Sequence, residues 1–487
     1  MSMKREEIRH LQYSTSEKHI VKNVYNTLMP SSLVHQDASR DDIAALLKQV
    51  LPAGHLELLA LIAEEAVNHG LPLYIIGGFV RDLFVGQAGL DFDLVVEGNA
   101  IAFARAISKK YGGKVTVHSH FGTASWQPDE KKLTNHKIEG FAGGNLAPLD
   151  FVTARSEIYL HPGALPTVRG GRLIDDLRRR DFTINSLALR LDGDHFGQLI
   201  DQLGGLEDLK RGVVRVLHRE SYIDDPTRIL RAIRYEKRYG FTIAPEDLEL
   251  ITEAKTHLGE LSGERLRHEL DLILAEDKAG EMLTHLDGLE ILKEIHPLLS
   301  WSAANSRSFE KLNQPEPNEW KDVPNLLHVP HKVGLHYLVW LGSLAPAGIH
   351  ELASRLDFAA SLREALLSLT SLLGDLPKLA DAKASEAVTH LEGLPLLVVC
   401  AASILANNKA RKVLENYMAT WRHIRQKTTG YDLIRRGLPP GPLYRNILSS
   451  LRKAWLDGEL KNDEEEKIFL EELISKIPPS NLLSLPK

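Results

Sequence analysis

The sequence predicts an α+β protein in which a small domain with a mixed β-sheet precedes a long, all-helical remainder. Short β-branched runs alternate with helical segments up to about residue 200, whereas helical periodicity takes over after about residue 205. The chain has 487 residues, of which 43% are apolar and 25% are charged. This balance is typical of a globular protein, and the length suits roughly three domains.

The first elements place a helix and a strand ahead of the sheet. Residues 54–69 carry apolar side chains at helical spacing and end at Gly70, a usual C-terminal cap. A strand is expected at 73–76. Further strands are expected at 92–96, 114–118, 148–153 and 196–200, and a further helix at 101–113. The polar tract 127–147 predicts a loop, and residues 301–330 predict an irregular linker.

The patterns divide the chain into five regions. Residues 1–53 form a polar, weakly periodic N-terminal extension with one or two short helices. The others are a mixed-sheet domain at 54–204 and three helical regions at 205–275, 276–400 and 401–487. No internal repeat or heptad pattern is visible.

Composition excludes several classes of protein. No run of eighteen apolar residues is present, so a membrane-spanning helix is not expected. The first ten residues lack the features of a signal peptide. Cys400 is the single cysteine, which rules out an intramolecular disulfide and favours the cytoplasm.

The charge is unevenly distributed. The net charge is −6, which argues against a protein that is basic throughout. The segment from 409 to 453, however, contains eleven Lys or Arg residues and only two acidic residues, Glu415 and Asp432. A local basic region of this kind favours contact with nucleic acid, so the last helical region is expected to bind RNA.

The strongest motif joins a diglycine to a pair of carboxylates. Asp91 and Asp93 stand two residues apart in an expected strand, so their side chains point to the same face. Two adjacent carboxylates repel each other unless a cation lies between them. Mg²⁺ prefers such oxygen ligands together with substrate phosphates, so Asp91 and Asp93 are the predicted metal ligands. Asp150, in a neighbouring strand, is a candidate third carboxylate, although a solvent-facing role is an open alternative.

Gly77 and Gly78 precede this pair. Glycines allow the backbone to approach a ligand closely, and the helix that follows offers free N–H groups to a triphosphate. Arg81, in the first turn of that helix, is placed to contact phosphate oxygens. The series of strand, diglycine, helix, strand and Asp-x-Asp resembles the nucleotidyltransferase superfamily that includes DNA polymerase beta.

The second motif is Arg179-Arg180-Asp181-Phe182-Thr183-Ile184-Asn185. Together with the two motifs before it, this run resembles class II tRNA nucleotidyltransferases and the related bacterial poly(A) polymerases. The resemblance implies that Arg180, Asp181 and Asn185 select the ribose. An amide and a carboxylate can each bond a ribose hydroxyl. A helix start capped by Asp181 is the alternative.

The third motif is Asp224-Asp225-Pro226-Thr227-Arg228. It resembles the family's Glu-Asp-x-x-Arg motif, which implies that Asp225 and Arg228 read the incoming base without a nucleic-acid template. A carboxylate accepts from the amino group of cytosine or adenine, and a guanidinium donates to the adjacent ring nitrogen. Uracil and guanine present the reverse pattern and would leave both groups mismatched. A helix-capping role for Asp225 is the alternative.

Four arginines continue this helix at helical spacing. They are Arg228, Arg231, Arg234 and Arg238. They predict a track for triphosphate or RNA backbone, with Arg231 and Arg234 as further nucleotide contacts. A surface of salt bridges is the alternative interpretation.

The resemblance implies a polymerase-beta-like head at 54–204, followed by a helical neck, body and tail. It implies Mg²⁺-dependent addition of C and/or A from CTP and ATP to the 3′ end of tRNA, with no membrane association and no obligate protein partner. Three alternatives stay open: a CC-only or A-only enzyme, a poly(A) polymerase acting on other RNA ends, and a catalytically silent RNA-binding protein. A flexible loop at 155–176 is expected to influence the choice between C and A.

Overall fold

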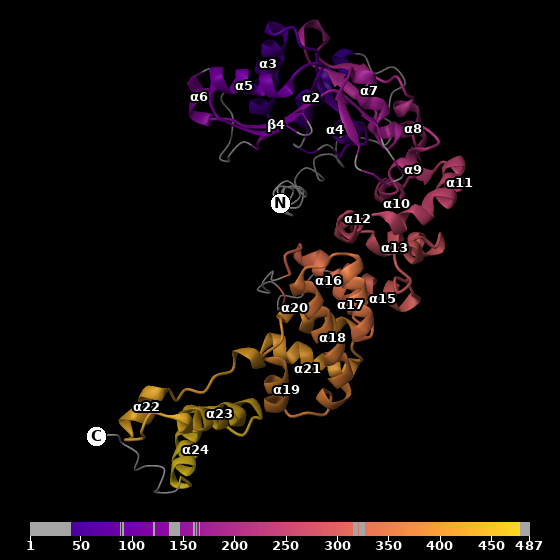
Figure 1. Cartoon of the computed structure of the whole chain (residues 1–487). Helices are drawn as coiled ribbons and strands as arrows, with labels where there is room; N and C mark the ends of the chain where they lie inside the picture. The colour runs from indigo at the N-terminus through magenta and orange to yellow at the C-terminus, as the bar shows by residue number, and fades with distance from the viewer. Residues whose placement is uncertain are drawn as a thin grey trace. The chain divides into compact units, whose positions relative to one another are not determined.

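The computed structural model describes residues 40–87, 89, 92–119, 122–135, 147–158, 161, 163–164, 166–314, 320 and 327–477. The chain divides into two compact units, residues 1–261 and 262–487 (Figure 1). The division falls inside the region predicted as a helical neck, residues 205–275.

The first unit is built on a seven-stranded sheet with the order β3-β4-β5-β2-β1-β8-β9. The strands are β1 (Leu73–Ile76), β2 (Asp93–Val96), β3 (Lys114–His118), β4 (Thr123–Gln127), β5 (Leu149–Thr153), β8 (Ala188–Arg190) and β9 (Gln198–Ile200). Strands β2 and β5 are parallel, and every other neighbouring pair is antiparallel. The predicted mixed sheet is therefore confirmed.

Alternating side chains cover both faces of this sheet with apolar contacts. On one face, Tyr74 and Ile76 of β1 pack with Val95 of β2 and with helix α7 (Leu173–Arg178). On the other face, Phe151 of β5 makes an edge-to-face contact with Phe103 of helix α5 (Ala100–Tyr111), with 5.5 Å between the ring centroids. Burial on both faces fixes the strand register, because a slip by one residue would exchange the two faces.

The remaining helices of the first unit are α2 (Arg40–Val50), α3 (Ala53–Asn68), α4 (Gly78–Phe84), α6 (Glu130–Asn135), α8 (Gly205–Arg211), α9 (Ser221–Asp224), α10 (Thr227–Tyr239) and α11 (Pro245–Ala254). The described residues of this unit also include the 3₁₀ turns η4 (Thr183–Asn185), η5 (Gly193–His195) and η6 (Lys255–Glu260). Two small sheets complete the unit: the antiparallel pair β6 (Arg155–Ile158) and β7 (Thr167–Gly170), and the parallel pair β10 (Val213–Val214) and β11 (Thr242–Ile243).

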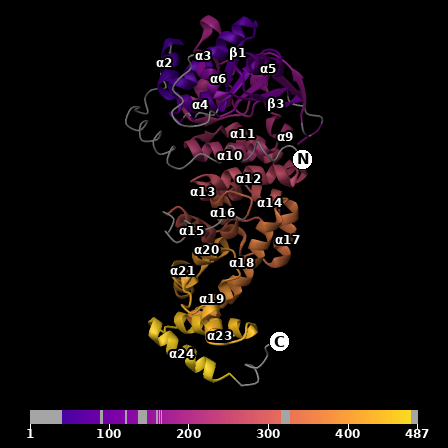
Figure 2. The same ribbon diagram turned by 90° about the vertical axis from the view of Figure 1, so that its left-hand side faces the viewer.

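The second unit is helical throughout its described residues (Figures 1 and 2). Its helices are α12 (Gly263–Ala275), α13 (Ala279–Gly288), α14 (Ile291–Ile295), α15 (Ala303–Leu312), α16 (His331–Leu341), α17 (Pro346–Arg355), α18 (Ala360–Leu379), α19 (Ala384–Leu391), α20 (Leu396–Leu405), α21 (Asn408–Ala419), α22 (Gly430–Arg435), α23 (Pro442–Leu456) and α24 (Asp463–Ser475), with a 3₁₀ turn η8 (Trp421–His423). In the described part of the chain, no helix has the length and apolarity needed to cross a membrane.

Most predicted elements are confirmed to within one or two residues, and three are wrong in part; residues 136–146, 159–160, 162, 165, 315–319 and 321–326 of these three segments lie outside the described residues. The predicted loop 127–147 contains α6, whose Leu133 is fully buried. The predicted linker 301–330 contains α15, which begins with a capping box formed by Ser302 and Asn305. The predicted flexible loop 155–176 contains the β6–β7 hairpin and the start of α7. Of the predicted N-terminal extension, residues 1–39 lie outside the described residues.

Candidate active site

The diglycine turn lies between β1 and α4. Gly77 has φ +77°, a conformation that L-residues rarely adopt. A Cβ atom at this position would lie 2.2 Å from a terminal nitrogen of Arg180, so a side chain cannot fit while Arg180 holds this position. The structure thus brings the predicted triphosphate contacts Gly77 and Gly78 together with Arg180, which is about one hundred residues later in the sequence.

The predicted carboxylates lie on two neighbouring strands. Asp93 begins β2 and is paired with Asp150 of β5 in the parallel register, and both residues are exposed. Paired residues on adjacent strands point to the same face about 4.8 Å apart, so the two carboxylates lie side by side. The expected position of Asp150 on a neighbouring strand is confirmed, and its catalytic role stays a prediction. Asp91 lies outside the described residues.

This pair is chemically suited to a hard cation. Mg²⁺ is bound in proteins by one or two carboxylates together with waters and substrate phosphates. Within the described residues no three His, Cys, Asp or Glu side chains gather into a metal site. Asp93 and Asp150 would therefore need Asp91 or substrate oxygens to complete the coordination of a metal.

Arg180 stands between the diglycine turn and α7. One terminal nitrogen donates to Asp176 over a long 3.4 Å, and its Nε is buried without a hydrogen-bond partner among the described residues. The neighbouring Arg179 is engaged more tightly, with Asp176 at 2.8 Å and Glu157 at 3.1 Å. Of the two adjacent arginines, Arg180 has the greater donor capacity left for an anionic ligand.

Asp181 and Asn185 lie deeper, in a buried polar network. Asp181 is 8% exposed and accepts four hydrogen bonds, from Phe182 N–H (2.9 Å), Asn185 Nδ2 (2.8 Å), and Arg231 Nε (2.8 Å) and Nη2 (2.6 Å). Burial acts to raise the pKa of Asp181, but Arg231 and Asn185 outweigh it, and the pKa lies well below its usual range. The carboxylate is therefore ionised, and its acceptor sites are fully used.

Arg81 belongs to the same network and is 4% exposed. Its Nε and Nη2 donate to the two oxygens of Asp82 at 2.9 and 3.0 Å, and its Nη1 donates to Asn185 Oδ1 at 2.5 Å. The guanidinium carbon lies 4.9 Å from the ring centroids of both Tyr235 and Tyr239. The expected contact between Arg81 and phosphate stays a prediction, and in this structure its bonds are intramolecular.

The predicted base readers lie at the start of α10. Asp225 accepts from the backbone N–H of Thr227 at 3.1 Å and from its hydroxyl at 2.6 Å, which forms a local turn before α10, whose N-cap residue is Pro226. Arg228 is buried and donates to Ser221 and, at 3.0 Å, to the carbonyl oxygen of Arg179. Both side chains are therefore engaged in local hydrogen bonds in this structure, and their role as base readers stays a prediction.

The four arginines at helical spacing on α10 are mostly less exposed than their predicted role as a surface track requires. Arg234 is 6% exposed and lies 5.1 Å from the Tyr235 ring, and Arg231 pairs with Asp181. Arg238 alone of the four is exposed. The four arginines thus mainly face the protein, and nucleotide contacts by Arg231 and Arg234 stay predictions.

Sequence reasoning missed three members of the network: Asp82, Tyr235 and Tyr239. Tyr239 donates its hydroxyl to Asp82 Oδ1 at 2.8 Å, and Arg231 donates to the Tyr235 hydroxyl at 3.2 Å. The available signal was the spacing of two tyrosines by four residues, which places both on one face of a helix.

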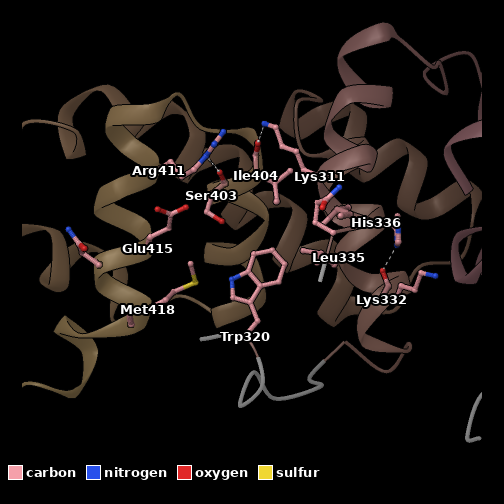
Figure 3. Close-up of a pocket in the computed structure, with 14 residues that line it drawn as sticks. Lys311, Trp320, Lys332, Leu335, His336, Ser403, Ile404, Arg411, Glu415 and Met418 are labelled. Carbon is pink, nitrogen blue, oxygen red and sulfur yellow. Dashed lines mark hydrogen bonds between the residues drawn. The ribbon is translucent and has the colours of Figure 1, made fainter. Parts of the chain in front are cut away.

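A cavity of about 500 Å³ lies away from these motifs, inside the second unit (Figure 3). Helices α15, α16, α20 and α21 line it, together with Trp320. Its cations are already engaged: Lys311 donates to the carbonyl of Ile404 and Arg411 to those of Ser403 and Ala406, at the end of α20. These contacts are typical of helix capping rather than of a catalytic site.

Comparison with known proteins agrees with the motifs. Residues 73–215 match the poly A polymerase head domain family, and residues 240–302 match a family described as the probable RNA and SrmB-binding site of polymerase A. An A-adding tRNA nucleotidyltransferase of Halalkalibacterium halodurans is 32% identical over 454 residues, which cover 91% of this chain and 99% of that protein.

Solved structures agree as well. The apo form of a CCA-adding enzyme shares 30% identity with a TM-score of 0.74, covering 89% of this chain and 99% of that one. The Thermotoga maritima CCA-adding enzyme complexed with tRNA shares 28% identity with a TM-score of 0.71, covering 90% and 98%. This chain therefore belongs to the class II CCA-adding family of tRNA nucleotidyltransferases.

Proposed function

We propose that this chain adds the terminal A to tRNA that already ends in CC, using ATP and no nucleic-acid template. The observation that carries this proposal is the likeness to an A-adding enzyme over 99% of that enzyme's length. Asp93 and Asp150, paired on the adjacent strands β2 and β5, would supply carboxylates that nucleotidyl transfer needs.

Full CCA addition is the second candidate. It is favoured by the TM-score of 0.74 to a CCA-adding enzyme, with 99% of that chain covered. The base-reading logic serves both candidates, because adenine and cytosine present the same order of donor and acceptor to a carboxylate and a guanidinium.

Asp91 and Asp93, with Asp150, would hold Mg²⁺. When bound, the ion would activate the 3′-hydroxyl of the RNA and neutralise charge on the triphosphate as pyrophosphate leaves. Gly77, Gly78 and Arg180 would receive the triphosphate, and a bound anion would supply the partner that Arg180 Nε lacks among the described residues. Arg81, Arg231 and Arg234 would add positive charge near these triphosphate-binding residues.

The remaining contacts select the nucleotide. Asn185, supported by Asp181, would meet the ribose, while Asp225 would accept from the adenine amino group and Arg228 would donate to N1. A base that presents a carbonyl beside an N–H would leave both readers mismatched, which gives strong rejection. The basic tail around residues 409–453 would contact the tRNA backbone in a salt-dependent way.

The test is nucleotide incorporation on tRNAs that end at the discriminator base, at C and at CC, with each NTP separately and with CTP plus ATP. A single A added only to the CC end would support the proposal. Addition of CCA to the discriminator end would favour the second candidate, and a long A tail on unrelated RNA would indicate a poly(A) polymerase.

Asp93→Asn serves as the chemical control. It should lower incorporation by at least about 10³-fold, because several kcal/mol of charge stabilisation is lost. Its unfolding temperature should stay near that of the unchanged protein, since Asp93 is exposed. An active Asp93→Asn variant would contradict the assignment of the metal ligands.

A further inference from the structure

Arg81 is enclosed on all sides by groups from three segments of the chain. The rings of Tyr235 and Tyr239 lie next to each other, with 6.1 Å between their centroids, and each centroid is 4.9 Å from the guanidinium carbon. Three of its nitrogens donate to Asp82 and Asn185, and the residue is 4% exposed. A phosphate could reach this guanidinium only by displacing one of these partners, so the side chain is arranged to link α4, η4 and α10 rather than to bind a ligand.

Besides the ring contacts of Arg81, one hydroxyl group links α4 to α10. Tyr239 donates to Asp82 Oδ1 at 2.8 Å, and among the described residues the other side-chain hydrogen bonds of Asp82 come from Arg81. Burial raises the pKa of Tyr239, so its hydroxyl stays protonated and remains a donor. Asp82 therefore holds Arg81 with both oxygens and Tyr239 with one of them, which joins the end of α10 to α4.

Arg81 also determines the orientation of Asn185, the predicted ribose contact. Arg81 can only donate, so it fixes the carbonyl side of the Asn185 amide toward itself. The amide nitrogen then faces Asp181 Oδ1, at 2.8 Å, and donates one of its two N–H groups there. The second N–H is left in a defined direction, whereas the four bonds accepted by Asp181 leave that carboxylate without capacity for a hydroxyl.

We propose that Arg81 is a positioning residue, held by Asp82 and Tyr239, that orients Asn185 and thereby sets the preference for a ribose over a deoxyribose. Asn185 touches the sugar in this scheme, while Arg81, Asp82 and Tyr239 act through it. The inference rests on the proposed ribose contact of Asn185. It differs from the expected phosphate contact of Arg81.

The experiment compares ATP with dATP on the full-length protein with tRNA ending in CC. For each variant, kcat and KM are measured for both nucleotides, and equilibrium binding of both is measured without RNA. Tyr239→Phe keeps the ring over Arg81 but removes the hydroxyl, and Asp82→Asn weakens the hold on both partners. The matched control is Tyr337→Phe, which removes a buried tyrosine hydroxyl that donates to Asp271 at 2.8 Å in the second unit.

The preference for ATP is expressed as kcat/KM for ATP divided by kcat/KM for dATP. We expect Tyr239→Phe to lower this ratio by about 3- to 10-fold, which corresponds to the loss of one hydrogen bond. Asp82→Asn should lower it further, and Asn185→Ala should remove most of it. Tyr337→Phe should leave the ratio unchanged even if it lowers the unfolding temperature. If Tyr239 had a purely structural role, Tyr239→Phe would reduce kcat/KM for ATP and dATP equally, and the ratio would stay the same.

Two results separate this inference from the proposed function. If Asn185→Ala lowers the ratio while Tyr239→Phe and Asp82→Asn keep it within about twofold of the unchanged protein, the inference is overturned and the ribose contact stands. If the unchanged protein adds no nucleotide to any tRNA end, the proposed function is overturned. The ATP-to-dATP binding ratios then still decide the role of Arg81.

Discussion

The two units use their buried polar groups in different ways. In the first unit, three hydrogen-bonded pairs join distant parts of the sequence: Asp181 with Arg231, Arg81 with Asn185, and Asp82 with Tyr239, which are 50, 104 and 157 residues apart. A bond between Asn185 and Asp181 connects the first two pairs. In the second unit many of the polar contacts are local or single, although the buried carboxylate of Glu466 accepts hydrogen bonds from Lys427, Thr428 and Trp455. His336 bonds the carbonyl of Lys332 one turn away, and the exposed Lys311 caps the end of α20 (Figure 3).

This difference has an energetic meaning. A buried charge is costly unless it is paired, and removing one partner of a connected set leaves several groups unsatisfied at once. A local contact loses only its own contribution when it is removed. Connected polar groups should therefore dominate the mutational sensitivity of the fold, and in the first unit they lie among the predicted nucleotide-binding motifs.

The largest effect on stability is expected for Asp181→Asn. The substitution leaves Arg231 without its buried counter-ion, which should lower the free energy of unfolding by about 3–5 kcal/mol. Urea unfolding followed by circular dichroism measures this loss. Asp194→Asn, an exposed aspartate of the same unit, is the control and should change stability by less than about 0.5 kcal/mol.

The pH dependence of the same variant has a definite sign. Because the pKa of Asp181 is lowered by folding, its stabilising effect is present above the unfolded pKa of about 3.9 and is lost as the pH falls through the folded value. The difference between Asp181→Asn and the unchanged protein should be constant from pH 8 to 5 and shrink below about pH 4. Equal stability of the two proteins at pH 7 would contradict the importance of the network.

A smaller, local effect is expected at His336 in the second unit. Burial lowers its pKa to about 4, so the unfolded chain binds a proton at mildly acidic pH that the folded protein does not. Stability therefore falls as the pH drops from about 6.5 towards 4, by about 2 kcal/mol between pH 7.5 and 5. Denaturant unfolding at these two pH values should show this loss.

The variant His336→Gln cannot titrate in this range. It should be less stable at pH 7.5, but its stability should change less between pH 7.5 and 5 than that of the unchanged protein. His350→Gln, at an exposed position of α17 in the same unit, should keep the original pH dependence. If His336→Gln also kept it, another group would be responsible for the acid sensitivity.

The same contrast explains what could be predicted from sequence. The diglycine turn, the Asp93 strand and the placement of Asp150 follow from local spacing and strand periodicity, and the structure has them as expected. The bond between Tyr239 and Asp82 joins residues 157 positions apart, and no local pattern indicates it. Likewise, the sequence identifies Asp181 as a carboxylate but gives no sign that Arg231 will use its remaining acceptor sites.

Two helices were not predicted from the sequence for a related reason. Helices α6 and α15 lie in polar tracts whose composition favours loops, yet each buries one key apolar residue, Leu133 in α6 and Phe309 in α15. Phe309 contacts Trp301 with 4.8 Å between their ring centroids. Tertiary packing thus overrides local propensity in both cases, and only the folded chain supplies the partner.

The smallest effect is expected at the end of α20. Lys311 donates to the carbonyl of Ile404 at 2.9 Å, a capping contact that stabilises by about 0.3–1 kcal/mol. Burial and the nearby Arg411 and Arg307 lower the pKa of Lys311, so relief of this repulsion offsets part of the loss in Lys311→Met. The unfolding free energy should therefore change by no more than about 0.5 kcal/mol. Nucleotide incorporation should stay the same, because no predicted nucleotide or metal contact lies at α20.

The control for this last variant is Lys412→Met, an exposed lysine of α21 in the same unit. Both proteins should unfold within one or two degrees of the unchanged protein in a thermal scan. Added salt should reduce the difference for Lys311→Met, because capping by a partly exposed cation is screened. A loss above about 2 kcal/mol would mean that the contacts at α20 are coupled like those around Arg81, and the contrast between the two units would fail.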